Sequence, residues 1–272
     1  MPRHREGLHR STSRYQVQSV ARALDMIDLL AALPDVGDGF SVTEIASRMN
    51  AAKSTAFSTL NTLVDAGFVA ATGGGPTKRY RLGPALIRLG TLARAQISLS
   101  DLARPYLIDL ARKVGATTRL AVLESDEVVV IDQVNISSVH RRDLRMGARE
   151  LLHSSALGKS ILSALTESHV RSMLVSAGMP KRTTRTMTEV DDLLDHLRLV
   201  ASVGYALDDE EDADGVFCVG APIRDHEGEC VGAISITGIK LHQPTVFYRR
   251  LGEQVEQRAK AVSKALGYLA AT

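Results

Sequence analysis

Residues 41–67 constrain the fold of this chain most strongly, because they have the pattern of two short helices joined by a tight turn. Ser41 followed three residues later by Glu44 is the sequence of a capping box, in which the two side chains satisfy free amides at a helix start. Residues 50–52 have the length of a helix-turn-helix connection. A second helix is predicted from about residue 53 to 66, and the glycine after it is a natural end.

The second helix of this pair has one apolar and one polar face. Its apolar residues recur at helical spacing and are expected to be buried: Ala56, Leu60, Leu63 and Val64. The opposite face carries a lysine, small hydroxyls, an amide and one aromatic ring: Lys53, Ser54, Phe57, Ser58 and Asn61. Such groups contact phosphates and base edges in a major groove, where Phe57 suits a thymine methyl. The pattern alone fits a solvated helix pair in an unrelated domain equally well.

A basic β-hairpin is predicted directly after the helix pair, across residues 68–82. Two short apolar runs flank a Gly-Gly-Gly-Pro loop, and Lys78, Arg79 and Arg81 follow it. A hairpin in this position is a wing, whose basic residues touch phosphate or the minor groove. A purely structural hairpin is the alternative. Three basic residues within four positions favour contact with a polyanion.

Residues 16–31 supply the third helix of this unit, because their apolar positions recur at helical spacing before Pro34. Three helices and a wing make a winged helix-turn-helix, which we assign to residues 15–83. Residues 1–14 contain four arginines and no apolar periodicity, so we expect a mobile basic arm or a leader without a role. Residues 84–98 are predicted to form a linker helix that is available as a dimer contact.

Composition indicates a soluble globular protein of 272 residues with 44% hydrophobic content. The front 96 residues carry 12 Lys and Arg against 7 Asp and Glu, whereas the remainder carries 21 against 24, which together give the net charge of +2. A basic front fits contact with phosphate. The sequence has neither a membrane-spanning run nor a secretory signal, and only Cys218 and Cys230 could pair, so we expect a reduced, cytoplasmic protein.

Residues 99–272 mix strands and helices with antiparallel hairpins, which predicts an α+β sheet packed against helices. After a helix over about 99–114, strands are expected near 118–124, 128–134, 144–146, 218–223 and 230–237. Helices are expected over 154–165, 167–177, 189–202 and 245–269. The fold class is therefore mixed α/β, of the α+β kind.

Several sequence patterns resemble active sites but lack the residues or the spacing that such sites need. Gly158-Lys159-Ser160 lacks the glycine that a P-loop needs five residues earlier, where His153 stands. His153, Asp208, Cys218 and Cys230 lack the close spacing of a zinc site, so neither a metal nor a cofactor is expected. No base is placed to activate Cys218, which we expect to be a small buried residue lining a cavity. The acidic run 208–212 reads as a solvated loop from which one carboxylate turns inward to hold a polar ligand.

The chain resembles the IclR-type bacterial transcriptional regulators from about residue 17 to 269. In the front part the resemblance rests on VQSVARALDMIDLL, SVTEIASRM, the KST that opens the second helix of the pair, and TLVDAGFV. In the rear part it rests on LRMGARELLHSSALGKSILSAL, YALDDEEDADGVFCVGAPI and VGAISITG. Several blocks in the family's order make the resemblance specific.

The resemblance implies a winged helix-turn-helix joined by a linker helix to a sensor domain similar to the GAF fold, here residues 99–272. It implies homodimers or tetramers that bind double-stranded DNA at palindromic operators as repressors or activators, controlled by a small organic or aromatic acid. The implied effector-binding residues are Met146, Ala156, Leu157, Asp208, Cys218, Ser235 and Thr237. Backbone amides at the start of the helix after Ser155 are expected to accept a carboxylate.

The predicted DNA-contacting set combines the helix pair and the wing: Ser41, Thr43, Lys53, Ser54, Thr55, Phe57, Ser58, Asn61, Lys78, Arg79 and Arg81. The chain departs from the family pattern at Ser58, where arginine is common, and at Ala52, where proline is common. These departures prevent transfer of an operator sequence. We therefore expect a DNA-binding regulator, with a repressor favoured. An enzyme acting on a small carboxylate and a ligand sensor without DNA binding are the alternatives.

Overall fold

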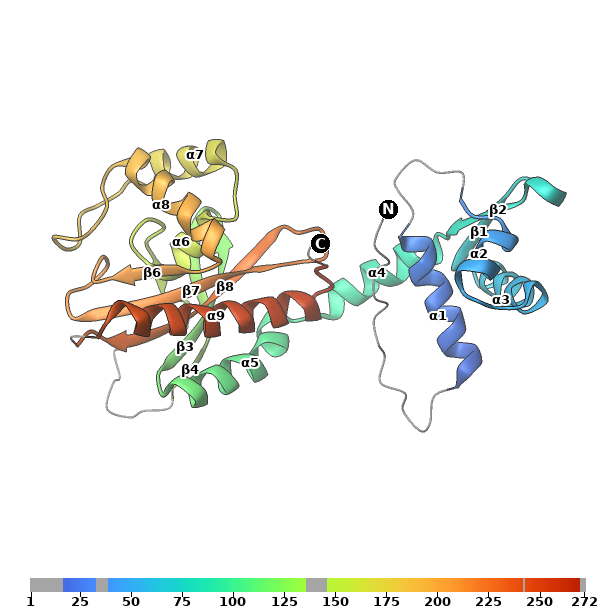
Figure 1. Cartoon of the computed structure of the whole chain (residues 1–272). Coiled ribbons are helices and arrows are strands. Elements are labelled where there is room, and N and C mark those ends of the chain that lie inside the picture. The colour runs from blue at the N-terminus through green and yellow to red at the C-terminus, as the bar shows by residue number, and fades with distance from the viewer. Residues whose placement is uncertain (1–16, 33–38, 136–145, 242, 270–272) are drawn as a thin grey trace. The chain divides into compact units, whose positions relative to one another are not determined.

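The computed structural model describes residues 17–32, 39–135, 146–241 and 243–269. The predicted arm over residues 1–14 lies outside these residues. The chain divides into two compact units, Met1–Ile97 and Ser98–Thr272. Each unit has an apolar core of its own, and Figure 1 labels the helices and strands of both.

The first unit contains helices and a two-stranded antiparallel sheet in the expected order. Its elements are α1 (Gln18–Ala31), α2 (Val42–Arg48), α3 (Lys53–Asp65), β1 (Val69–Thr72), a short 3-10 turn (Gly75–Thr77), β2 (Arg79–Leu82) and α4 (Ala85–Gln96). The capping box at α2 is present: the Ser41 side chain accepts from the Glu44 amide, and the Glu44 side chain accepts from the Ser41 amide. The predicted helix pair is therefore confirmed.

The core of the first unit joins α1, α2 and α3 to the wing. Met26 and Leu30 of α1, Ile45 of α2, Leu60 of α3 and Tyr80 of β2 are buried together in one apolar cluster. Phe40 exchanges backbone hydrogen bonds with Tyr80, at N···O distances of 3.0 and 2.8 Å, and so attaches the chain before α2 to the wing. This cluster fixes the direction in which α3 presents its polar face.

The second unit is a six-stranded antiparallel sheet with the order β5-β4-β3-β8-β7-β6. Its strands are β3 (Thr117–Glu124), β4 (Glu127–Val134), β5 (Arg149–Glu150), β6 (Ala206–Asp209), β7 (Val216–Arg224) and β8 (Cys230–Ile239). Its helices are α5 (Leu99–Val114), α6 (Ala156–Leu162), α7 (Glu167–Ala177), α8 (Val190–Val203) and α9 (Thr245–Ala265). The sheet with helices on its faces confirms the predicted α+β class.

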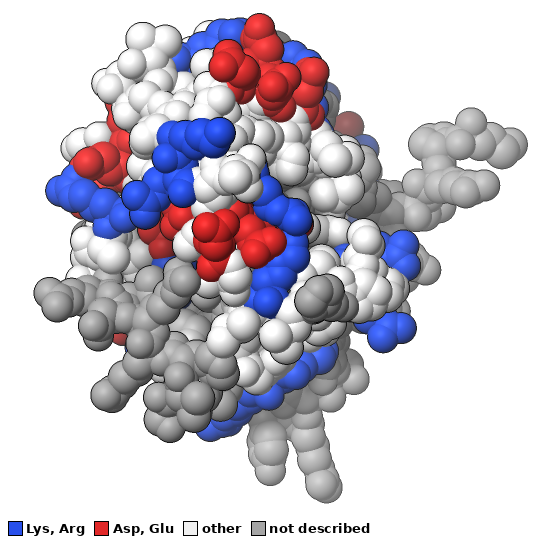
Figure 2. Space-filling view, turned by 90° about the vertical axis from the view of Figure 1, so that its left-hand side faces the viewer, with Lys and Arg blue, Asp and Glu red and all other residues white. Residues whose placement is uncertain are grey.

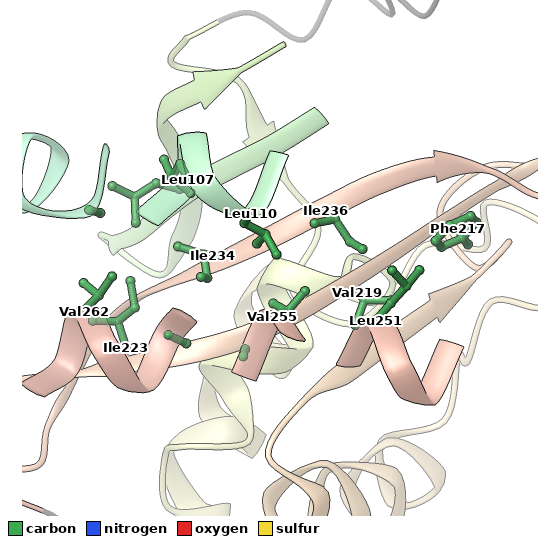
Figure 3. Packing of buried hydrophobic residues seen from close by; sticks show 14 of the residues in the cluster. Leu107, Leu110, Phe217, Val219, Ile223, Ile234, Ile236, Leu251, Val255 and Val262 are labelled. Carbon is green, nitrogen blue, oxygen red and sulfur yellow. The ribbon is translucent and has the colours of Figure 1, made fainter. Parts of the chain in front are cut away.

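Helices cover both faces of this sheet, as Figure 1 shows. On one face, strand residues such as Val219 and Ile234 pack against α5 and α9, represented in Figure 3 by Leu110 and Val255. On the other face, α6, α7 and α8 enclose a second apolar cluster that includes Leu157. A side chain at Gly220 would lie 2.7 Å from the Ala156 carbonyl oxygen, so glycine here lets α6 approach β7 closely.

Four elements of the second unit differ from prediction. The helix expected over residues 154–165 is shorter, because Ser155 caps it and a turn follows Leu162. The helix expected to reach residue 269 ends at Ala265. Strand β6 was not predicted, since its acidic sequence reads as a loop. Of the strand expected at 144–146, only Met146 is described, and it lies in a turn before β5.

The surface of the second unit mixes charges of both signs. Arg185 pairs with Asp209 and Glu210, and Lys240 pairs with the same two carboxylates. Figure 2 likewise shows basic and acidic side chains beside one another on the face that it draws. This arrangement provides no uniform positive field of the kind that attracts nucleic acid.

Candidate DNA-contacting surface and ligand pocket

Helix α3 presents most of its predicted contact residues to solvent. Lys53, Ser54, Phe57 and Ser58 are exposed, while Thr55 and Asn61 are half-buried. Phe57 leaves 46% of its surface exposed although the core of the unit lies on the opposite side of the helix. An exposed aromatic ring beside hydroxyl and amide groups gives α3 a face that suits base edges.

The turn before α3 differs from the turn before α2 in its capping. Ala52 occupies the N-cap of α3 and provides no side-chain hydrogen bond, so the first amides of α3 remain without a side-chain cap. In contrast, the Ser41 hydroxyl and the Glu44 carboxylate lie 2.6 Å apart within the capping box. Ser41 is thus already engaged, whereas Thr43 is exposed.

The three basic residues of the wing have different surroundings. Arg81 is exposed and makes no ion pair among those found in the described residues. The Lys78 ammonium lies 5.3 Å from the centroid of the Tyr80 ring. Arg79 donates to the Glu44 carboxylate at 2.5 Å, which ties the wing to the start of α2. Arg81 and Lys78 are therefore freer than Arg79 to meet a phosphate.

A small cavity of about 50 Å³ lies in the second unit between the sheet and the loop that follows β6. Three predicted effector residues line it: Asp208 of β6, Cys218 of β7 and Thr237 of β8. Their backbones are cross-strand neighbours, since Asp208 pairs with Cys218 and Cys218 pairs with Thr237. Cys218 and Thr237 also contact each other, with Sγ and Oγ1 3.3 Å apart.

The environments of these residues shift their protonation. Burial raises the pKa of Asp208 to about 7, although its carboxylate accepts from the amides of Glu211 and Asp212 and faces the Lys159 charge. Burial raises the pKa of Cys218 to about 12, so this thiol stays protonated at neutral pH. Two carboxylates of the acidic run 208–212 turn inward and are buried, those of Asp208 and Glu211.

The other predicted effector residues occupy different positions. Ala156 packs with Cys218 and Val216 beside the cavity. Leu157 points into the apolar cluster under α7 and α8 instead. Met146 is 67% exposed, so it is no wall of the cavity. Ser235 is fully buried next to Arg119 in the β3–β8 pairing, and its hydroxyl has no hydrogen-bond partner in the ranges that the structure describes.

The cavity contains charged residues that sequence reasoning missed. Arg119 of β3 and Glu150 of β5 line it and form an ion pair, together with the lining residues Ser155, Asp212, Ala213 and Val216. Arg119 directly precedes the apolar run 120–123 of its strand and is 3% exposed. An arginine next to an apolar run in a predicted strand was the available signal, because a buried guanidinium needs a partner inside the fold.

The start of α6 does not match the expected carboxylate site. The Ser155 hydroxyl already accepts from the Gly158 amide at 2.9 Å, and every residue of this seven-residue helix is buried. Lys159 is internal as well: its ammonium donates to the Leu207 carbonyl at 2.6 Å and to Glu211 at 2.5 Å. The Gly-Lys-Ser sequence therefore contributes a structural ion pair and no phosphate loop.

Within the residues that the structure describes, no group of three or more His, Cys, Asp or Glu side chains is arranged to hold a metal ion. In the same part of the chain, no helix combines the length and apolar character needed to cross a bilayer.

Comparison with known proteins identifies the family that has this architecture. Residues 91–264 match the family described as bacterial transcriptional regulator IclR C-terminal, and residues 19–73 match the IclR helix-turn-helix domain. The regulator XynR of Escherichia coli is 31% identical over 93% of this chain and 98% of its own length. The glycerol operon regulatory protein of Streptomyces coelicolor is 36% identical over 92% of this chain and 97% of its own length.

Solved structures show the same arrangement. The Agobacterium tumefaciens repressor BlcR superposes with a TM-score of 0.80 at 27% identity, over 93% of this chain and 99% of that chain. Thermotoga maritima IclR is 31% identical with a TM-score of 0.61, over 92% of this chain and 99% of that chain. A helix-turn-helix unit followed by an effector-binding unit defines the class of protein: a transcriptional regulator rather than an enzyme. The chain belongs to the IclR family of bacterial transcriptional regulators.

Proposed function

We propose that this chain is a homodimeric or tetrameric repressor that binds a palindromic operator and responds to a small organic or aromatic acid in the Arg119–Asp208 cavity. The observation that carries the DNA-binding part is the exposed polar face of α3, which is supported by a buried core and flanked by a basic wing. Repression is supported by relatives that are named as repressors. One of them is the acetate operon repressor of Salmonella typhimurium, 31% identical over 93% of this chain and 91% of its own length.

The proposed contacts divide into two groups. Lys53 and the wing residues Lys78 and Arg81 serve as phosphate contacts, which fix the position of the unit on DNA. Ser58 and Asn61 serve as base contacts, because hydroxyl and amide groups distinguish base edges in the major groove. Ser54, Thr55, Phe57 and Thr43 complete the proposed surface. Ser41 contributes through the capping box that orients α2.

The proposal of a second copy rests on the linker helix. None of the described side chains of α4 is buried, and Ile87 and Leu92 leave 75% and 50% of their surfaces exposed. Large exposed apolar groups on one helix favour association. A twofold-symmetric dimer presents two α3 helices, which corresponds to two operator half-sites.

The test of DNA binding is a fluorescence-anisotropy titration with DNA from the region upstream of the protein's own gene, at two salt concentrations. We expect binding that weakens steeply as salt rises, because phosphate contacts release counterions. Replacing Ser58 or Asn61 by alanine should change base preference more than overall affinity. Flat, salt-independent titrations would support a ligand sensor without DNA binding. Equal losses on specific and random DNA would remove these residues from base recognition.

A further inference from the structure

One edge of the Arg119 guanidinium has no carboxylate partner, although the side chain is almost completely buried. Its Nη1 atom donates to Glu150 Oε1. Among the residues that the structure describes, its Nη2 atom has only the Cys218 sulfur at 3.9 Å and its Nε atom has no partner. A guanidinium recognises a carboxylate through two parallel N–H groups on one edge. The Nε and Nη2 groups of Arg119 form such an edge, and Glu150 does not occupy it.

A second unpartnered atom lies on the same ion pair. Glu150 binds Arg119 through Oε1, and its buried Oε2 atom has no hydrogen-bond donor within the described part of the chain. Burying a polar group without a partner costs free energy, so unpartnered buried groups of this kind call for a ligand or an ordered water. The pair therefore lacks two acceptors for Arg119 and one donor for Glu150.

The size of the cavity restricts what can supply these groups. At about 50 Å³ it is far smaller than an apolar cavity of roughly 150 Å³ that accommodates benzene. An aromatic ring would require a large rearrangement, whereas a two- or three-carbon molecule requires little. Apart from Val216, the other lining residues are polar or small: Ser155, Asp208, Asp212, Ala213, Cys218 and Thr237.

We infer that the effector is a short aliphatic hydroxycarboxylic acid, whose carboxylate binds the Nε–Nη2 edge of Arg119 and whose hydroxyl donates to Glu150 Oε2. This inference rests on the proposed function and narrows its effector class. A carboxylate without a hydroxyl leaves Glu150 Oε2 without a donor. A neutral diol leaves the Arg119 edge unsatisfied. Only a molecule with both a carboxylate and a hydroxyl supplies the acceptors that Arg119 lacks and the donor that Glu150 lacks.

The test is isothermal titration calorimetry of the full chain with four probes: glycolate, acetate, ethylene glycol and benzoate. Glycolate is expected to bind about tenfold or more tightly than acetate or ethylene glycol, since a site built around a hydroxyl rejects an analogue that lacks it. Benzoate is expected to bind weakest. Tighter binding of benzoate, equal binding of acetate and glycolate, or no glycolate binding at millimolar concentration would overturn the inference.

Two variants and one control separate recognition from folding. Arg119→Lys keeps the positive charge and removes the two-pronged edge, so it should abolish the glycolate preference over ethylene glycol. Glu150→Gln keeps the shape and places an amide NH₂ where Oε2 stood, so acetate affinity should rise toward that of glycolate. Glu124→Gln changes an exposed carboxylate at the end of the Arg119 strand and should change neither affinity. Circular dichroism verifies folding, and an unchanged glycolate-to-acetate ratio in a folded Glu150→Gln variant would contradict the assignment.

The outcomes distinguish this inference from the proposed function. If glycolate binds as expected and the protein does not bind DNA, the ligand assignment stands and the proposed regulatory role is wrong. If benzoate changes DNA affinity and glycolate does not, the regulatory role stands and the ligand assignment fails.

Discussion

Asp208 and Lys159 are buried ionisable side chains, and their surroundings give them different roles. Lys159 has no exposed surface and is paired with Glu211. Asp208 lines the cavity, has no ion pair among the described residues and is held by two backbone amides. Lys159 therefore organises the loop after β6, whereas Asp208 faces the cavity with a carboxyl that is close to its titration point.

The raised pKa of Asp208 predicts a pH-dependent stability. Its pKa rises from 3.8 to about 7 on folding, so between these values the folded protein holds a proton that the unfolded chain has released. This contribution to stability is fully present below the unfolded value and is lost as pH rises through about 7. Relative to wild type, Asp208→Asn should be more stable near pH 8 than near pH 5, by about 2 kcal/mol.

Urea unfolding at several pH values measures this difference. The amide oxygen of Asn can still accept from the Glu211 and Asp212 amides, so the loop should keep its conformation. Asp214→Asn, at an exposed position, is the matched control and should follow wild type. A constant difference between Asp208→Asn and wild type at every pH would contradict the assigned titration.

The Lys159–Glu211 pair predicts a strong dependence of stability on both partners. Lys159→Met removes the cation and leaves Glu211 buried without its counter-charge, which should lower the free energy of unfolding by about 3–5 kcal/mol. The double variant Lys159→Met/Glu211→Leu removes both charges and should recover most of that loss. Denaturant titrations compare the two. Equal destabilisation in the single and double variants would show that the ion pair is not the reason for the effect.

At the scale of elements, sequence periodicity predicted the helices and most strands because burial on one face leaves a repeat in the sequence. The α2–α3 pair and α7 follow this rule. Strand β6 escaped prediction, since the residues after Leu207 are acidic and the Leu207 carbonyl is bonded by Lys159 from a helix far away in the sequence. Such long-range compensation leaves no local pattern.

The candidate cavity was predictable only in part. Asp208, Cys218 and Thr237 came from the family resemblance, and the antiparallel register of β6, β7 and β8 brings them side by side. Arg119 and Glu150 were missed because their pairing crosses β4, and the sequence does not reveal strand order. Met146 is largely exposed, and Leu157 packs into the apolar cluster under α7 and α8. Neither of these two predicted residues therefore forms a wall of the cavity.

The wing predicts unequal effects of its three basic residues on DNA binding. Lys78→Ala and Arg81→Ala should each weaken binding across all sequences and reduce the slope of log affinity against log salt by about 1. Arg79→Ala should reduce it less, because Glu44 already neutralises this guanidinium. Anisotropy titrations over a salt series give the three slopes. The largest change at Arg79, or unchanged slopes at Lys78 and Arg81, would exclude this use of the wing.

At the scale of the whole molecule, two compact units divide the work of the proposed regulator. The first has its own core and offers the α3 face and the wing, and the second has two cores and encloses the cavity. Control of one unit by the other requires that the effector bind with different affinity to the DNA-bound and free forms. Linkage then requires that DNA change the affinity for the effector by the same factor.

The most direct test of this account therefore measures the coupling in both directions with the same protein. Operator affinity is measured without effector and with saturating effector, and effector affinity is measured without and with saturating operator. The account predicts an equal factor in the two experiments, about 5- to 150-fold, and no factor on random DNA. Tight binding of both partners with no effect of either on the other would contradict ligand-controlled DNA binding.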